Sequence, residues 1–230
     1  MLLPFTMRLR RLVSTRTDDL NPGDVFGHVY RRNRWGRQHG ERFFSGPGSH
    51  DPEIVDPYVK AVGAFLDGFS TPPDVVDLGC GDFNVGRRIR DRCGAYIACD
   101  VVDALIRHNT RRFASLNVEF RCVNIVDEHL PPGDVAFLRQ VLQHLGNAQI
   151  AKIVLKLSGY RHVVVTEHLP DAEAFTPNLD REAGSGIRVA RGSGVVLTAP
   201  PFNLSPKGQR ELCKVRKYGG RVVTNAYEIG

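Results

Sequence analysis

The stretch that decides the fold is Val75–Gly81, which reads Val-Val-Asp-Leu-Gly-Cys-Gly. Its first four residues are almost continuously apolar, which is typical of a buried strand in a parallel sheet. The glycines that follow permit a tight turn and let the backbone approach a ligand without interference from Cβ atoms. We therefore expect a ligand site at the carboxyl end of this strand.

Further apolar runs follow this strand and alternate with segments of helical periodicity. This alternation predicts a parallel sheet in an α/β fold. Near the C-terminus the pattern changes, because two runs flank Gly219-Gly220, a pair suited to a hairpin turn with positive φ. The predicted strands are 75–78, 96–99, 118–123, 135–138, 162–166, 211–217 and 221–227.

Two segments lie outside this pattern. Residues 1–50 are rich in Arg, Gly and Pro with scattered aromatic residues, which predicts a basic N-terminal arm or cap on a main domain of residues 51–230. Regular structure is expected to begin at Asp51. Between the fifth strand and the hairpin, residues 168–207 form a connection too long for a compact domain, so we interpret it as a lid over the substrate.

Composition limits the function classes. The 230 residues are 42% hydrophobic and can bury one core. The net charge is +6, and the basic excess between Arg8 and Arg42 could bind nucleic acid, although solvated arginines are the commoner explanation. The five cysteines form no C-x-x-C pair and resemble core residues in a reducing compartment. Without a secretory or membrane-spanning pattern, a cytoplasmic protein that does not bind membranes is expected.

The glycine turn favours one kind of nucleotide ligand. A dinucleotide fingerprint would need a third glycine at position 84, where Asn84 stands, and no P-loop lysine follows. The second predicted strand leads to Asp100, 23 residues after Asp77. A carboxylate at that place can accept hydrogen bonds from both ribose hydroxyls. A nucleoside without a phosphate tail fits these residues best.

With these features the sequence resembles the class I S-adenosylmethionine-dependent methyltransferases over about residues 50–167. Val76–Gly81 matches the first motif of that family, and Asp100 matches its ribose-binding acid. The resemblance implies a Rossmann-like sheet of seven strands, mostly parallel, with an antiparallel C-terminal hairpin and helices on both faces. It also implies S-adenosylmethionine as the cofactor. The hairpin at Gly219-Gly220 was inferred independently and agrees.

The family's roles can be carried over to matching positions. Asp77 would orient the turn and the methionine ammonium, while Asp100 and Val101 would border the ribose. Asn124 and Ile125 stand where the family contacts adenine, although an acid is missing at 124. The remaining candidates surround the amino-acid portion of the cofactor: Gly79, Cys80, Gly81, Arg139 and Gln140.

Methyl transfer is an in-line displacement, so the protein chiefly aligns the reactants and excludes water. A hydroxyl acceptor must also lose a proton, and a base helps. His144 follows the fourth predicted strand at the carboxyl edge of the sheet and is the first candidate for this base. A capping or core histidine is the alternative interpretation. Glu167 is the second catalytic candidate.

Polar residues near the fifth strand suggest two further roles. Glu167 and His168 at its end, with Asp180 in the lid, could hold a divalent ion such as magnesium, although loop acids are usually solvated. His168 and Asp180 could also contact the substrate. Trp35 is a third substrate candidate, because aromatic rings suit sugars, unless it only anchors the arm.

The leading hypothesis is therefore a methyltransferase that acts on a hydroxyl of a small molecule, such as a sugar or glycoside, in an enclosed pocket. A homodimer is compatible with this hypothesis. The alternative is a non-catalytic or RNA-directed protein of the same fold that uses its basic arm. Base methylation of nucleic acid is disfavoured, because Arg139–Leu142 replaces the Asn/Asp-Pro-Pro-Tyr/Phe motif.

Overall fold

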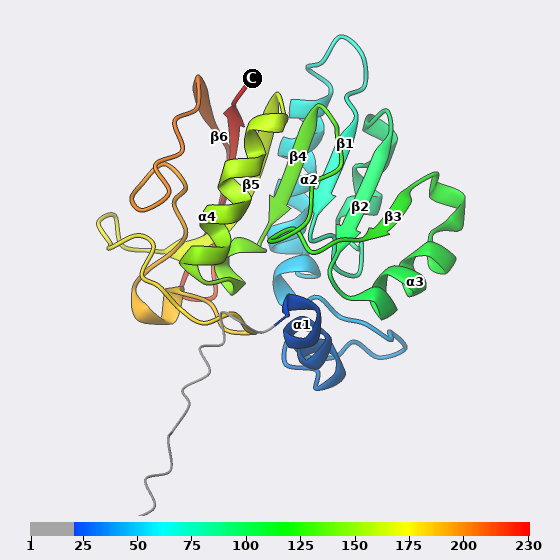
Figure 1. The fold of residues 1–230 in the computed structure, drawn as a ribbon, viewed down its shortest axis with the longest axis horizontal. Helices are drawn as coiled ribbons and strands as arrows, with labels where there is room; N and C mark the ends of the chain where they lie inside the picture. Colours follow the sequence, from blue (N-terminus) through cyan, green and yellow to red (C-terminus); the bar gives the residue numbers. More distant parts are fainter. Residues whose placement is uncertain (1–20) are drawn as a thin grey trace, which may run out of the picture.

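The computed structural model describes residues 21–230, so the arginines at positions 8–16 of the expected arm lie outside it. A sheet of seven strands forms the centre of the molecule in the order β3-β2-β1-β4-β5-β7-β6 (Figure 1). The first five strands are parallel, and β7 runs antiparallel to both of its neighbours. The strands are β1 Val75–Leu78, β2 Tyr96–Asp100, β3 Glu119–Cys122, β4 Val135–Arg139, β5 His162–Pro170, β6 Gly208–Lys217 and β7 Gly220–Glu228.

Helices cover both faces of the sheet, as predicted. Buried residues of α2 pack with one side of the central strands, whereas those of α4 pack with the other side (Figure 1). The helix α2 begins where Asp51 accepts a hydrogen bond from the Glu53 N–H and Pro52 occupies the first helical position. The helices are α1 Pro22–Arg31, α2 Pro52–Leu66, α3 Asp103–Arg112 and α4 Asn147–Lys156. The predicted Rossmann-like α/β fold is confirmed.

The expected start of regular structure at Asp51 is wrong, because α1 precedes it. The Asn21 side chain accepts a hydrogen bond from the Gly23 N–H, and Pro22 follows at the first helical position. This capping signal was present in the sequence but was obscured by the high Arg and Gly content around it. Residues 21–50, which we call the cap, therefore contain a folded helix.

The C-terminal hairpin is present, and its turn differs by one residue from the prediction. Lys217 pairs with Gly220, so the turn residues are Tyr218 and Gly219, with φ of 52° and 71°. Gly220 lies within β7 and is needed for another reason. A Cβ atom there would collide with the Leu169 carbonyl oxygen of β5.

Pairing with β7 also extends β5 to Pro170, because the ladder runs from His162 to that residue. The predicted lid therefore begins at 171 and not at 168. Residues 171–207, which we call the lid, contain one 3₁₀ turn at Val189–Arg191 and no other regular element. No helix within residues 21–230 has the length and apolar character needed to cross a membrane.

All five cysteines are free. Cys93 and Cys99 are buried, as expected for core residues, but Cys122 is exposed. Its strand β3 is at the edge of the sheet and is only partly covered. The interpretation of every cysteine as a core residue was therefore too broad.

A buried asparagine holds the lid in shape. Asn178 adopts φ of 57°, and its Nδ2 donates to the carbonyl oxygens of Val196 and Pro200 at 2.9 and 2.8 Å. Its Oδ1 accepts from the Val196 N–H at 2.9 Å. These bonds replace the regular backbone ladder that the lid lacks.

We predict that Asn178→Ala lowers the free energy of unfolding by about 2–4 kcal/mol, because it leaves buried backbone groups without partners. Asn203→Ala is the matched control, since Asn203 also has positive φ but is exposed and makes one long side-chain bond. Urea unfolding of the three proteins measures the difference. Equal destabilisation by both variants would contradict this role of Asn178.

Candidate functional site

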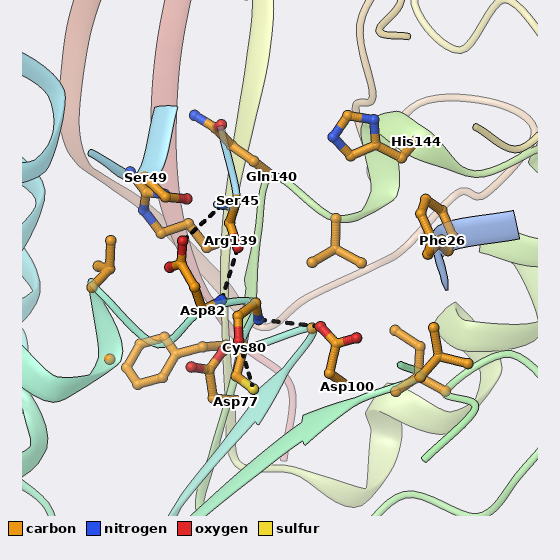
Figure 2. A pocket seen from close by; sticks show the side chains of 18 of the residues that line it. Phe26, Ser45, Ser49, Asp77, Cys80, Asp82, Asp100, Arg139, Gln140 and His144 are labelled. Carbon is orange, nitrogen blue, oxygen red and sulfur yellow. Dashed lines mark hydrogen bonds between the residues drawn. The ribbon is translucent and has the colours of Figure 1, made fainter. Parts of the chain in front are cut away.

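A pocket of about 120 Å³ opens at the carboxyl ends of β1, β2 and β4. This is the edge where open α/β sheets bind ligands, next to the point at which the strand order reverses. The cap supplies aromatic and hydroxyl side chains to its wall, and Gln140 and His144, which follow β4, lie beside them (Figure 2). All ten predicted cofactor residues line it: Asp77, Gly79, Cys80, Gly81, Asp100, Val101, Asn124, Ile125, Arg139 and Gln140.

The glycines of the first turn are required by close packing. Gly79 and Gly81 have φ of 91° and 56°, a region that residues with a Cβ atom rarely adopt. A Cβ atom on Gly79 would collide with the Val141 side chain, and one on Gly81 would lie 2.5 Å from Ser45 Oγ. The turn therefore fits closely between the segment after β4 and the cap.

Two buried carboxyl groups lie beside this turn. Asp100 accepts hydrogen bonds from the N–H groups of Gly81 and Val102 at 3.1 and 3.0 Å, while burial raises its pKa to about 6. Burial raises the pKa of Asp77 to about 7, against the hydrogen bond of 3.0 Å that it accepts from the Tyr96 hydroxyl. A positively charged ligand group would favour the ionised form of each carboxyl.

Arg139 contributes a buried positive charge. Its Nη2 donates to the Gly48 carbonyl oxygen at 2.7 Å, and its guanidinium lies 4.8 Å from the centre of the Tyr58 ring. Among residues 21–230 it forms no ion pair, and its buried Nε has no hydrogen-bonding partner. An anionic ligand group could therefore pair with this guanidinium.

The other end of the pocket is mainly apolar. Val101, predicted beside the ribose, and Ile125, predicted beside adenine, both line it. The Asn124 side chain serves the local turn instead, since its Oδ1 accepts from the Val126 N–H at 3.0 Å and its Nδ2 donates to Asp127 at 3.1 Å. Sequence analysis could not determine that this amide is already hydrogen bonded.

His144 ends a 3₁₀ turn, Leu142–His144, after β4 and lines the pocket. Its Nδ1 lies 2.9 Å from the Gly186 carbonyl oxygen, which can only accept, so Nδ1 carries the proton and Nε2 is the acceptor, 3.5 Å from Gln143 Nε2. Burial lowers the pKa of His144 to about 4, which keeps the ring neutral. The centre of its ring lies 5.0 Å from the ring centre of Trp35 and 6.4 Å from that of Phe26. His144 therefore lies in the pocket, and its role as the base stays a prediction.

The three residues proposed for magnesium are not brought together. Glu167 shares the sheet face of Val165, which packs with α4, whereas His168 faces the opposite side because successive strand residues alternate. His168 Nε2 lies 3.1 Å from the Lys217 carbonyl oxygen, and Asp180 accepts from the Asn147 N–H. None of the three lines the pocket, and residues 21–230 contain no cluster of three metal-ligating side chains.

Sequence reasoning missed the hydrogen bonds that join the cap to the glycine turn. Asp82 Oδ2 accepts from the Ser45 N–H at 2.7 Å (Figure 2). The same oxygen lies 2.7 Å from His50 Nε2. The Asp82 N–H donates to Ser45 Oγ at 2.8 Å, and the Tyr30 hydroxyl lies 2.9 Å from the same oxygen. The only sequence signal was an acid directly after Gly81. These contacts close one side of the pocket.

No protein-family model matches this sequence, and no curated protein matches it. Several solved structures are similar in fold. The N-methyltransferase NodS from Bradyrhizobium japonicum WM9, with S-adenosylhomocysteine, has a TM-score of 0.61 and 11% identity, over 88% of this chain and 99% of that chain.

Magnesium protoporphyrin IX methyltransferase from Synechocystis PCC 6803, with bound S-adenosylmethionine, has a TM-score of 0.56 and 15% identity, over 91% of this chain and 98% of that chain. A Burkholderia thailandensis 1,6-didemethyltoxoflavin-N1-methyltransferase has a TM-score of 0.54 and 14% identity, over 90% of this chain and 87% of that chain. The chain therefore has the fold of the class I S-adenosylmethionine-dependent methyltransferases.

We predict that Asp82→Asn loosens the cap, because Oδ2 serves Ser45 and His50 while Oδ1 accepts from the Asn84 N–H at 3.2 Å, and an amide has an acceptor at only one of these two positions. The free energy of unfolding should fall by about 1–3 kcal/mol, and the amides of α1 should exchange faster with solvent. Asp91→Asn is the control, since Asp91 is exposed and makes no side-chain bond within the described residues. Unchanged exchange in α1 would contradict the role of Asp82.

Proposed function

We propose that this protein transfers a methyl group from S-adenosylmethionine to a hydroxyl of a small molecule. The observation that carries the proposal is the pocket at the carboxyl ends of β1 and β2, where Gly79 and Gly81 bring the backbone close and Asp100 lies alongside. This arrangement occurs in a fold shared with methyltransferases whose structures hold S-adenosylmethionine or S-adenosylhomocysteine.

The charged groups of the pocket suit the two ends of this cofactor. The Arg139 guanidinium, which lacks an ion pair among the described residues, would bind the methionine carboxylate, and Asp77 would attract the ammonium. Asp100 would accept from the ribose hydroxyls, because each carboxylate oxygen retains a lone pair beyond its backbone bond. Val101 would border the ribose, and Ile125 would contact adenine. When bound, the sulfonium supplies an electrophilic methyl group.

His144 is placed to receive the acceptor's proton. The Gly186 carbonyl holds its Nδ1–H, and the lone pair of Nε2 can accept a hydrogen bond from the acceptor's hydroxyl. A pKa of about 4 makes this imidazole a weak base. A hydroxyl oxygen that has just received a methyl group is a far stronger acid, so a weak base suffices to take its proton. The ring would thus orient the oxygen first and deprotonate it late.

The wall around His144 favours an uncharged acceptor. Phe26 and Trp35 stack with centroids 6.2 Å apart, and the Trp35 Nε1–H donates to the Ser185 carbonyl oxygen at 3.1 Å. Cap and lid thus meet beside the base and limit access of water. An aromatic wall suits the apolar face of a sugar ring, so a saccharide hydroxyl is the acceptor that we propose to test first.

The acceptors named for the similar structures, magnesium protoporphyrin IX and 1,6-didemethyltoxoflavin, belong to those proteins and differ in chemistry. A screen with labelled S-adenosylmethionine should therefore include pooled sugars, phenols, amines and RNA. We expect transfer to a sugar or phenol pool. Transfer only to RNA or to amines would contradict the proposed hydroxyl acceptor.

We predict that affinity for S-adenosylmethionine rises between pH 6 and 8. Burial raises the pKa of Asp77 to about 7 and that of Asp100 to about 6, so both carboxyls ionise across this range. Because the ligand's ammonium stabilises ionised Asp77, binding near pH 6.5 should release protons. Titration calorimetry in buffers of different ionisation enthalpy measures this release.

Asp77→Asn should lower the affinity about tenfold and remove most of the proton release. Methylthioadenosine, which lacks the amino-acid portion, is the matched ligand control and should bind Asp77→Asn and the unmodified protein alike. If the folded protein binds neither S-adenosylmethionine nor S-adenosylhomocysteine, the proposed function is wrong.

We predict that His144→Gln lowers kcat about 100- to 10,000-fold, because the acceptor loses its base. The Kd for S-adenosylmethionine should stay within about threefold, since the cofactor's charges are held elsewhere. His129→Gln serves as the control, because His129 is exposed and lies outside the pocket. Steady-state kinetics with the acceptor found in the screen give both constants. Retained turnover in His144→Gln would exclude it as the base.

A further inference from the structure

Arg188 of the lid is buried, with 1% of its surface exposed. It donates to backbone carbonyls on the turn that carries His144: Nη1 to Leu142 and Gln143 at 3.2 Å each, and Nη2 to Leu145 at 2.8 Å. Further bonds join Nη2 to Asn147 Oδ1 at 3.0 Å and Nε to the Leu179 carbonyl at 2.9 Å. Every nitrogen of this guanidinium is therefore used.

The turn satisfies only part of its own carbonyl groups: the Leu145 N–H donates to the Leu142 carbonyl oxygen at 3.0 Å, whereas the Gln143 and Leu145 carbonyls take their donors from lid arginines. The 3₁₀ turn Leu142–His144 ends at Leu145, which is extended with φ of −105° and ψ of 156°. Carbonyl oxygens at a helix end require partners, and each buried one left alone costs roughly 1–3 kcal/mol. Arg188 supplies partners from a segment more than 40 residues away in the sequence.

Other lid residues contact His144 directly. The Gly186 carbonyl accepts from Nδ1 at 2.9 Å, and the Gly184 N–H donates to the His144 carbonyl at 3.0 Å. Gly186 lies two residues before Arg188, and Arg181 Nη1 also donates to the Gly186 carbonyl and, at 3.2 Å, to that of Gln143, so two lid guanidiniums, Arg188 through its anchor and Arg181 directly, hold this carbonyl. The imidazole is thus held by a glycine-containing loop that has no regular structure of its own.

We propose that Arg188 is a positioning residue that fixes the lid against the Leu142–Asn147 turn, so that the Gly186 carbonyl selects the Nδ1–H tautomer of His144. Nε2 then presents its lone pair to the acceptor. The catalytic consequence rests on the proposed function, but the tautomer can be measured by itself. The lid is therefore a fixed part of the site and more than a cover.

The groups around His144 set its pKa, which is therefore a quantity that should change when Arg188 is replaced. Arg181 and Arg188 face it from the lid, and both positive charges add to the effect of burial in lowering its pKa. The cap contributes the uncharged rings of Trp35 and Phe26. From β5, Glu167 lies beneath the same turn, and burial raises its pKa to about 8, which keeps it neutral. Release of the lid would expose the imidazole to water.

The test is NMR of the protein labelled with ¹⁵N-histidine, with His144→Gln used to assign the His144 signal. In the unmodified protein we expect one tautomer, protonated at Nδ1, that does not titrate above about pH 5. Arg188→Gln should give a mixture of tautomers, with the His144 pKa shifted toward its ordinary value of about 6.5. Arg191→Gln is the matched control, because this exposed lid arginine makes one bond to the Asp180 carbonyl.

Arg188→Lys covers the case in which Arg188→Gln does not fold. A lysine ammonium keeps the charge but cannot donate to all five acceptors of Arg188. The pKa of His144 should therefore rise in this variant too, but by less than in Arg188→Gln. With an active acceptor, kcat of this variant should fall about tenfold at nearly constant KM for S-adenosylmethionine, and the acidic limb of the pH–rate profile should move to higher pH.

The possible outcomes separate the two proposals. An unchanged His144 signal in folded Arg188→Gln or Arg188→Lys would overturn the positioning role, even if His144 proves to be the base. The expected shift without turnover by any form of the protein would support the positioning role while the proposed function fails.

Discussion

The close approach of the Gly79–Gly81 backbone to its neighbours constrains the rest of the structure. The segment after β4 occupies the space that a Cβ atom on Gly79 would need, and Ser45 of the cap occupies the corresponding space beside Gly81. Both contacts require positive φ and the absence of a side chain. Because the turn is fixed from two sides, the Asp100 carboxylate can accept a hydrogen bond from the Gly81 N–H and still line the pocket.

Three parts of the chain that are distant in sequence meet around this turn. The cap closes one side through Ser45 and Asp82, the strand ends supply the carboxyls, and the lid holds His144 through Gly186 and Arg188. Burial is the common physical cause of the altered ionisation, since it raises the pKa of the carboxyls and lowers that of the imidazole. Burial shifts each group toward its uncharged form, and a ligand group of opposite charge would shift it back.

Much of the framework could be predicted because it follows from local patterns. Short apolar runs predicted the strands. The glycine turn and Asp100 predicted the ligand edge, and the family resemblance that they carry implied the remaining cofactor residues, all of which line the pocket. The predictions failed where long-range contacts decide. Hydrogen bonding to β7 makes β5 longer than predicted. Because side chains alternate between the two faces of a strand, Glu167 and His168 point to opposite sides of the sheet. The helix α1 was not predicted, although Asn21 and Pro22 form a helix-start signal.

The sequence by itself determined the α/β class, the ligand edge of the sheet and the residue types available there, because strand periodicity and glycine conformation are local properties. Only the tertiary structure decided which polar groups already have hydrogen-bonding or ionic partners and which are available to a ligand. The Asn124 amide is already hydrogen bonded, Arg139 lacks an ion pair within residues 21–230, and His144 is a neutral Nδ1–H imidazole. Hydrogen-bond partners and burial arise from segments that fold together from distant positions, and no local pattern encodes them.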